Sequence, residues 1–464
     1  MQSNEQKPQS HPSLSFKEKL GYGLGDMASN FYLGFFGLYL LYYFTDIYGL
    51  APAAVGLMLL ISKIVDAVSD PLMGAVADRT QTKMGKYRPY LLWMAVPYGL
   101  LGFAIFFGPN FSDTGKLIYA YVTYIGVMLA FTAINVPYSA LLAVIHPSAE
   151  ERTKATTYRL VCAGIGTLLI AAFATPLSKL LGGGDDVLGF RITMGIFAGL
   201  SIAIFWFTYA STKERISLPK HESSVLKDMG ELVKNTSWIM LAVSCILIVI
   251  GLIARFSSII YYVKYYMQDS GEAVFWIFDR VAIFTSFGII GQIFGAMIAS
   301  WLALYFSKHR IVLFMCVLHA VLLMIGYFVP PDMYALTVFL HFIGIGTFGV
   351  VITLFFSMFT DCAEYGEWKT GKRTSGLTVS ASMFALKFGS ALGGALPGFI
   401  LAYVGFVANE VQTDEAILGL RLMATAVPAI LFAIGGLMML FYTLDKQTIA
   451  NIESELKVRR AGHA

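Results

Sequence analysis

Long apolar segments separated by short polar connections make up most of the chain. Charged residues together with Gly, Pro, Asp and Asn divide the chain into twelve such segments. They are 27–45, 52–77, 89–108, 117–145, 158–181, 190–210, 238–262, 277–305, 311–329, 333–358, 376–404 and 416–442. A helix that crosses a hydrocarbon layer of roughly 30 Å needs about 20 apolar residues. The pattern therefore predicts an all-α membrane protein with twelve transmembrane helices.

The most charged long stretch, residues 211–237, separates the first six segments from the last six. We therefore predict a cytoplasmic N-terminal segment (1–26), a six-helix bundle (27–210), a central cytoplasmic loop (211–237), a second six-helix bundle (238–442) and a cytoplasmic tail (443–464). Two six-helix halves joined by a long loop resemble the major facilitator transporters, whose substrate binds between the halves near the middle of the membrane.

Basic residues are concentrated in alternate connections. If the N-terminus lies in the cytoplasm, 24 of the 33 Lys and Arg residues fall in the two tails and the even-numbered connections. Cytoplasmic loops of membrane proteins carry an excess of Lys and Arg. Both termini are therefore expected in the cytoplasm, as an even number of spans requires.

Composition narrows the class of protein further. Apolar residues make up 57% of the chain, charged residues 13%, and the mean hydropathy is +0.68. These values exclude an ordinary soluble, fibrous or disulfide-stabilised protein. The net charge of +4 lies between apolar runs, so membrane lipid is an expected partner and nucleic acid is not. The N-terminus does not resemble a cleaved signal peptide, and we expect a multi-pass protein of the bacterial inner membrane.

Three ionisable residues lie in the second predicted span. Lys63, Asp66 and Asp70 are spaced to share one helix face, with Ser69 beside them. Two carboxylates one turn apart repel each other unless a cation lies between them or one is protonated. The pattern predicts a cation site, with sodium on Asp66 and Asp70 if sodium is the ion, and Thr132 of span four as a further oxygen ligand. The alternative is an ion-pair cluster that joins the halves without a ligand.

Other polar residues within the predicted spans are candidates for substrate binding. Lys387 interrupts the apolar run 376–404, where it can reach the span-two carboxylates or donate to substrate hydroxyls. Amide and tyrosine side chains can bind sugar hydroxyls and stack on sugar rings. The remaining candidates are Asn30, Asn135, Tyr138 and Arg159, the last of which is equally explained by topology. Arg255 in span seven lies close enough to a span end to snorkel to the interface.

Four longer motifs carry a family resemblance. They are Tyr22-Gly-Leu-Gly-Asp26, Asp66-Ala-Val-Ser-Asp70-Pro-Leu-Met-Gly74, Asn135-Val-Pro-Tyr138 and Asp361-Cys-Ala-Glu364-Tyr-Gly-Glu367-Trp368. These motifs, which run through nearly the whole chain, resemble the melibiose permeases and their relatives, the glycoside-pentoside-hexuronide:cation symporters. The resemblance implies that Asp66, Asp70 and Thr132 bind the coupling cation. It places Lys387 close to both cation and sugar, and Arg159 in the substrate region or the inner gate.

The chain departs from the melibiose permeases at positions that hold the sugar. Their galactoside-binding carboxylates on spans one and four correspond to Asn30 and Asn135 here, and two of their aromatic positions are Ser139 and Ile352. The resemblance therefore implies a substrate other than an α-galactoside, such as a pentoside, a plant or algal oligosaccharide fragment, or an acidic sugar.

Charged residues of both halves are expected at the cytoplasmic side of the membrane. The connection after span two carries Arg79 and Arg88, and the stretch after span ten carries Asp361, Glu364 and Glu367. We predict that they form an ionic lock which closes the cytoplasmic mouth in the outward-facing state. The alternative is that both stretches are solvated loops.

These features together predict a secondary active symporter that imports a sugar or glycoside with sodium or a proton, as a monomer and without a cofactor. A major-facilitator exporter or proton-coupled antiporter of small molecules is the alternative. Such an exporter more often has an apolar pocket with one titratable carboxylate. The sequence displays neither a His/Cys/Asp metal cluster nor a Ser-His-Asp arrangement, so we expect no enzyme activity.

Overall fold

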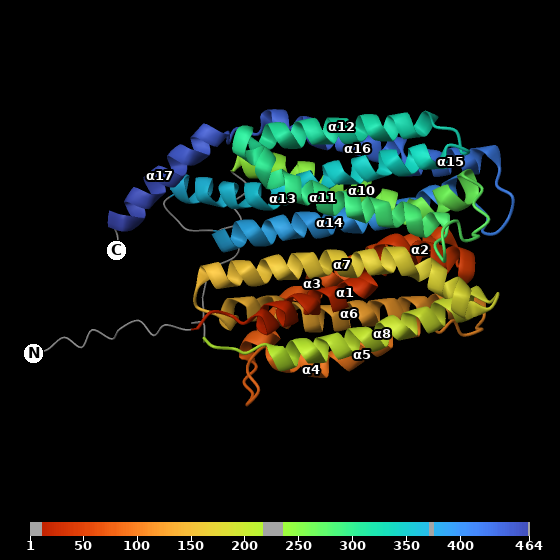
Figure 1. The fold of residues 1–464 in the computed structure, drawn as a ribbon, viewed down its shortest axis with the longest axis horizontal. Helices are drawn as coiled ribbons and strands as arrows, with labels where there is room; N and C mark the ends of the chain where they lie inside the picture. The colour runs from red at the N-terminus through yellow and green to blue at the C-terminus, as the bar shows by residue number, and fades with distance from the viewer. Residues whose placement is uncertain (1–11, 217–234, 371–374, 463–464) are drawn as a thin grey trace, which may run out of the picture.

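A computed structural model describes residues 12–216, 235–370 and 375–462, which form two bundles of helices that lie side by side (Figure 1). The N-terminal half contains α1 (Phe16–Leu38), α2 (Leu40–Tyr42), η1 (Tyr43–Ile47), α3 (Pro52–Arg79), α4 (Arg88–Trp93), α5 (Ala95–Ile105), α6 (Asp113–Ile145), α7 (Ala149–Gly182) and α8 (Asp186–Ser211). The charged central loop lies largely outside the described residues.

The C-terminal half has the same overall plan. It contains α10 (Thr236–Tyr261), η2 (Tyr262–Tyr266), α11 (Arg280–Tyr305), α12 (Lys308–Phe328), α13 (Tyr334–Thr370), α14 (Ser375–Tyr403), α15 (Asp414–Ala424), α16 (Ala426–Leu437), η3 (Met438–Phe441) and α17 (Lys446–Gly462). The start of α1 and the end of α17 lie at the same end of the molecule (Figure 1).

The helices agree with most of the predicted spans. Within the described residues, ten helices are long and apolar enough to cross a membrane. The other two predicted segments correspond to α1 with α2, and to the pair α4 and α5. The fold is therefore that of an all-helical, multi-pass membrane protein.

Three helix ends lie more than a few residues from the prediction: α1 and α7 begin early, α7 at Ala149 rather than at 158, and α13 ends late. Helix α1 begins at Phe16, well before residue 27, because Ser15 and Glu18 cap it reciprocally: each side chain accepts a hydrogen bond from the other residue's backbone N–H. Helix α13 continues to Thr370, so Asp361, Glu364 and Glu367 lie on a helix rather than in the solvated loop that the alternative interpretation assumed. Hydropathy marks where a helix leaves the membrane, but it does not mark where the helix ends.

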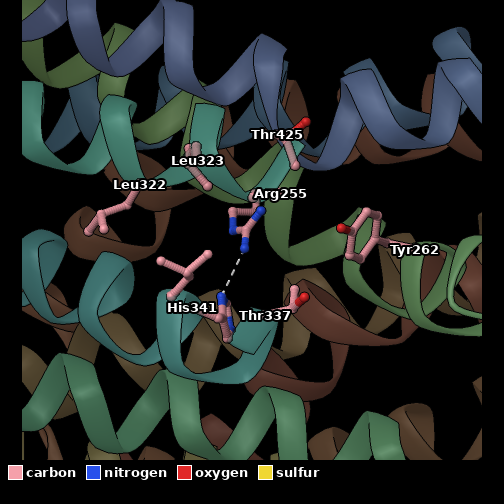
Figure 2. Close-up of a pocket in the computed structure, with 9 residues that line it drawn as sticks. Arg255, Tyr262, Leu322, Leu323, Thr337, His341 and Thr425 are labelled. Atoms are coloured by element: carbon pink, nitrogen blue, oxygen red, sulfur yellow. Dashed lines mark hydrogen bonds between the residues drawn. The ribbon is translucent and has the colours of Figure 1, made fainter. Parts of the chain in front are cut away.

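Two predicted spans are broken at comparable places. Helix α4 ends at Trp93 and α15 ends at Ala424, and each is followed four residues later by a proline, Pro97 or Pro428. Proline has no N–H to donate to the carbonyl four residues earlier, so the helix is interrupted there. The second of these breaks lies beside Arg255 of α10, which donates to the Ala424 carbonyl oxygen and to His341 (Figure 2). Arg255 is buried, so it does not snorkel to a membrane interface as the sequence suggested.

The two halves meet where α3 packs on α14, α7 packs on α11, and α1 and α2 pack on α10. Small residues allow the first pair to approach closely. A Cβ atom added to Gly56 would lie 2.9 Å from the Ala395 carbonyl oxygen, and one added to Gly398 would lie 2.5 Å from the Pro52 carbonyl oxygen. This contact brings the charged face of α3 next to Lys387 of α14.

Candidate cation and sugar site

Asp70 joins three helices from both halves of the molecule. Its Oδ1 accepts a hydrogen bond of 3.0 Å from the Thr132 hydroxyl of α6, and its Oδ2 forms an ion pair with the Lys387 ammonium of α14. The predicted contact of Lys387 with the span-two carboxylates is therefore made with Asp70. Residues 317 positions apart in the chain are brought into direct contact.

Asp66 lies one turn away and is only partly satisfied. Its side chain is buried, with 3% of the residue exposed, and its Oδ2 lies 3.4 Å from the Lys63 ammonium. Its Oδ1 is buried, and none of the residues that the structure describes forms a hydrogen bond with it. Because a buried carboxylate oxygen without a partner is costly, this atom is a candidate ligand for a cation or a proton.

Neutral oxygen atoms complete the cluster. The Ser69 hydroxyl donates to the Asp66 carbonyl oxygen at 3.3 Å and lies 3.5 Å from the Thr132 hydroxyl. Carboxylate, hydroxyl and carbonyl oxygens are the ligands that hard cations prefer. The structure therefore brings the four predicted cation ligands, Asp66, Ser69, Asp70 and Thr132, into one cluster.

The same residues also form the ion pairs expected from the alternative interpretation, a cluster that joins the halves without a ligand. Lys63 pairs with Asp66 inside α3, while Lys387 pairs with Asp70 across the two halves. Two lysines and two aspartates balance in charge without a bound ion. A cation that enters must therefore compete with a lysine, which is the property required of a coupled site.

A cavity of about 170 Å³ lies beside Lys63, between the two halves. Helices α1, α3 and α6 line it from one side, and α10 and α14 from the other. Its lining residues include Phe36, Lys63, Tyr124, Met128, Ser257 and Ser390. Hydroxyl groups, an ammonium group and aromatic rings are the chemistry that recognises a sugar.

Arg159 is paired with an aspartate that sequence reasoning did not assign. Its Nε donates to Asp26 Oδ2 at 3.0 Å, and its guanidinium lies 4.9 Å from the centre of the Tyr138 ring. The Asn30 amide donates to the Asp26 carbonyl oxygen at 2.8 Å and accepts from Thr167 at 3.3 Å. Asp26 ends the first family motif, so the sequence did mark it as a residue of interest. Its place near the end of a span gave no reason to pair it with Arg159.

Tyr138 and Asn135 differ in accessibility. Tyr138 is fully buried, stacks on Tyr22 at 4.8 Å between ring centres, and donates its hydroxyl to the Tyr22 carbonyl oxygen at 2.5 Å. Its hydroxyl is therefore not free for a substrate, and the ring supports Arg159 instead. Asn135 is half-buried, and its Oδ1 lies 3.5 Å from the Ser139 hydroxyl.

Two of the predicted gating residues, Arg88 and Asp361, bind partners within their own halves in this conformation. Arg88 donates to the Tyr209 carbonyl oxygen at 2.9 Å, Asp361 pairs with Lys308 at 2.7 Å, and Arg79 is exposed at the end of α3. Glu364 and Glu367 lie on the same helix as Asp361. The cross-half lock between Arg88 and Asp361 is therefore not formed here.

A glutamate not assigned from the sequence anchors the loop before Arg88. Glu214 accepts hydrogen bonds of 2.8, 2.7 and 2.9 Å from the backbone N–H groups of Lys86, Tyr87 and Arg88. Lys86 also pairs with Asp78 at 2.9 Å. Burial lowers the pKa of Lys86, but the hydrogen bonds with Asp78 and Tyr87 outweigh it, so the pKa lies above its usual value.

The halves are also linked at the end of the molecule opposite the chain termini, by residues that sequence reasoning missed. Asp46 pairs with Lys264 at 3.0 Å, and its carbonyl oxygen accepts from the Asn409 amide at 2.6 Å. In the reverse direction, Asp279 of the C-terminal half pairs with Lys179 of the N-terminal half at 2.7 Å. We call these four residues, Asp46, Lys264, Asp279 and Lys179, the outer clamp.

Comparison with known proteins identifies the family. A family model described as MFS/sugar transport protein matches residues 21–446. The chain belongs to this family. The transporter is 33% identical to a putative glycoside/cation symporter, YagG, of Escherichia coli (strain K12), over 97% of this chain and 96% of that protein. It is 30% identical to an isoprimeverose transporter of Lactiplantibacillus pentosus, over 98% of this chain and 96% of that protein.

A solved structure supports the fold of the transporter. The structure of a bacterial homologue of the human lysosomal transporter Spinster has a TM-score of 0.66 and 13% identity, and the match covers 94% of this chain and 97% of that one. The resemblance to the glycoside-pentoside-hexuronide:cation symporters is thus confirmed by the relatives. The protein is a membrane transporter rather than an enzyme.

Proposed function

We propose that this transporter imports a sugar or glycoside across the bacterial inner membrane, coupled to sodium or a proton. The observation that carries the proposal is the unpaired, buried Asp66 Oδ1 beside an Asp70–Lys387 ion pair that joins the two halves. A cation bound by Asp66, Ser69, Asp70 and Thr132 satisfies the unpaired oxygen and competes with Lys387 for Asp70. Loading of the ion thereby changes a contact between the halves.

The cavity beside Lys63 is the proposed sugar site in this conformation. Its position between the halves is where major facilitator transporters bind substrate. Asn30, Asn135, Arg159 and Lys387 are the residues that we assign to the substrate path, with Tyr138 behind Arg159. Asn30 and Asn135 stand where the melibiose permeases have galactoside-binding carboxylates, so they favour a substrate other than an α-galactoside.

The remaining features of the proposal concern topology and gating. We assign twelve spans with both termini in the cytoplasm and a monomer surrounded by lipid. In that orientation the outer clamp closes the external side, so this conformation faces inward. Arg79 and Arg88 then meet Asp361, Glu364 and Glu367 when the cytoplasmic side closes.

The test is uptake of a panel of labelled sugars into vesicles, with sodium and pH gradients imposed separately. The panel includes pentosides, plant and algal oligosaccharide fragments, and hexuronides. We expect one sugar class to accumulate against its gradient with one of the two ions. Sugar movement only out of loaded cells, driven by an inward proton gradient, would instead support the exporter alternative.

A further inference from the structure

The loop between η2 and α11, residues 267–279, carries a cluster of exposed apolar side chains at the end of the molecule opposite the chain termini. Val274, Phe275 and Trp276 follow one another, and they are 58%, 70% and 78% exposed. The charged residues of the loop lie on either side of this cluster. We call Val274, Phe275 and Trp276 the apolar tip.

The apolar tip is held in a tight turn by its own backbone. The Val274 N–H donates to the Phe278 carbonyl oxygen at 2.9 Å, and the Phe278 N–H donates to the Phe275 carbonyl oxygen at 2.9 Å. Trp276, inside this turn, has a φ of 54°, in the left-handed region that bulky residues rarely adopt. Trp276 therefore combines backbone strain with a largely exposed apolar side chain, and a contact outside the chain can offset these two costs.

The base of the loop is fastened to the N-terminal half. Lys179 of α7 pairs with Asp279 at 2.7 Å, which is one of the two ion pairs of the outer clamp. Between ring centres, Phe278 lies 5.6 Å from Phe173 of α7, and Trp276 lies 6.0 Å from Phe278. A series of aromatic contacts thus connects the apolar tip to α7, beside the outer clamp.

The helices next to the loop have exposed apolar faces. Leu180, which follows Lys179 on α7, is 65% exposed. On α11, Phe287, Phe294 and Trp301 are exposed at intervals of seven residues, which places them on one helix face. An exposed apolar face of a membrane-crossing helix contacts lipid. The apolar tip therefore adjoins a lipid-facing surface where α7 packs on α11.

We propose that the apolar tip inserts into the headgroup region of the bilayer and anchors this loop to lipid. The assignment to the outer leaflet, but not the insertion itself, rests on the topology proposed above. Trp is enriched where a bilayer meets water, because its ring is largely apolar while the indole N–H can still bond to polar groups. Since Asp279 follows Trp276 by three residues, the inserted tip supports the Asp279–Lys179 pair of the outer clamp.

Other occupants of the tip require a different chemistry. A sugar needs hydrogen-bonding groups around an aromatic ring, and the side chains of Val274, Phe275 and Trp276 offer only the indole N–H. A specific protein interface buries about 800 Å² on each side, which three consecutive residues do not provide. Lipid is the partner that needs neither a pocket nor a large complementary surface.

The first test is cysteine labelling of the full-length protein in phospholipid nanodiscs, where aqueous reagents reach both sides of the membrane. The four natural cysteines are buried, so an introduced cysteine gives the signal. Trp276→Cys is expected to react with a membrane-impermeant maleimide roughly tenfold more slowly than Glu272→Cys, an exposed residue of the same loop.

A nanodisc with one protein molecule contains neither a second copy nor a partner protein, so slow labelling of Trp276→Cys there reports lipid. Equal rates for the two variants would overturn the proposal. Because both membrane faces are accessible, this result is distinct from a failure of the proposed topology or of the proposed transport.

Fluorescence provides a second measurement that does not depend on a cysteine. The difference in tryptophan emission between the unmodified protein and Trp276→Phe isolates Trp276 from the other tryptophans. We expect phospholipids brominated close to the headgroup to quench this difference signal. A signal that aqueous iodide quenches and brominated lipid does not would place Trp276 in water and overturn the proposal.

The link to the outer clamp has its own test in sealed vesicles. Trp276→Ser is expected to raise about twofold the rate at which external maleimide labels Ser390→Cys, in the cavity between the halves. Ala273→Ser, a change at an exposed neighbour outside the tip, is the control. Equal labelling rates in the two backgrounds would show that the apolar tip does not support the clamp.

Discussion

The central cluster and the outer clamp both join the halves through lysine–aspartate pairs, but they differ in how completely their carboxylates are satisfied. In the outer clamp, Asp46 receives Lys264 and Tyr265 on its side chain and Asn409 on its carbonyl oxygen. In the central cluster of Lys63, Asp66, Asp70 and Lys387, one oxygen of Asp66 is buried and has no partner among the described residues. A carboxylate with all its hydrogen bonds made favours a contact that stays closed, whereas a carboxylate with an unpaired oxygen favours a site that binds and releases a ligand.

The largest expected effect comes from removing the unsatisfied carboxylate. For a neutral sugar that moves with one cation, a potential of 100 mV supplies about 2.3 kcal/mol, which allows roughly 40–50-fold accumulation. Asp66→Asn is expected to abolish this accumulation, measured as uptake of labelled sugar into vesicles, while downhill exchange continues. Asp113→Asn, an exposed aspartate at the start of α6, is the control. Full accumulation by Asp66→Asn would remove this carboxylate from the coupling site.

The next effect tests the ion pair that joins the halves at the centre. Lys387→Ala leaves Asp70 without its ammonium partner, so we expect strongly reduced transport and about 1–2 kcal/mol less stability for this half-exposed pair. Lys387→Arg keeps the charge but not the compact shape, and should rescue transport only in part.

A double variant separates this pair from a simple packing effect. Asp70→Asn is expected to restore part of the stability of Lys387→Ala without restoring coupled transport. The measurement is thermal unfolding in detergent, compared as a double-mutant cycle. If the single changes merely add, Lys387 does not act through Asp70.

A smaller effect is expected at the outer clamp. Lys264→Met removes one partly exposed ion pair between the halves, worth about 1 kcal/mol. This corresponds to a roughly fivefold shift from the externally closed toward the externally open conformation. We expect faster labelling of Ser390→Cys by a membrane-impermeant maleimide added outside. Lys116→Met is the matched control, because Lys116 donates to the Tyr48 carbonyl oxygen of its own half, at 3.3 Å, and lies over the Tyr48 ring. Equal labelling rates in the two backgrounds would show that the clamp does not hold the external side closed.

The smallest effect is expected at Tyr138. Tyr138→Phe removes the hydrogen bond to the Tyr22 carbonyl and should cost about 1 kcal/mol of stability. The KM for sugar should change by less than about twofold, since the hydroxyl does not reach the substrate path. Tyr22→Phe removes a hydroxyl that has no hydrogen-bond partner among the described residues, so it should cost less stability than Tyr138→Phe. A tenfold rise in KM for Tyr138→Phe would show instead that the Tyr138 hydroxyl contributes to substrate binding.

The sequence predicted the central cluster because the spacing of residues along a single helix is enough to bring most of its charges together. Spacing on one helix places Lys63, Asp66 and Asp70 on a common face, and the cost of buried charge identifies Lys387 as a residue that needs a partner. The apolar segments likewise located the membrane-crossing helices to within a few residues at most ends.

The pairing of the outer-clamp residues and the burial of Tyr138 could not be predicted from the spacing of residues along the chain. Asp46 and Lys264 are 218 positions apart and lie near span ends, where charge is ordinary. The burial of Tyr138 follows from packing against Tyr22, which no periodicity reveals. Arg255 is a similar case, because its burial and its partners Ala424 and His341 come from packing against other helices, which its place along α10 does not reveal.

The central claim is that Asp66 binds the coupling cation and thereby links the cation to the sugar. The most direct measurement is the sugar affinity of the purified protein at low and saturating sodium, and at two pH values, for the unmodified protein and for Asp66→Asn. We predict that one of the two ions tightens sugar binding several-fold in the unmodified protein and has no effect in Asp66→Asn, because coupling between sites is reciprocal. Sugar affinity that ignores both ions in the unmodified protein, or that still responds in Asp66→Asn, would contradict the claim.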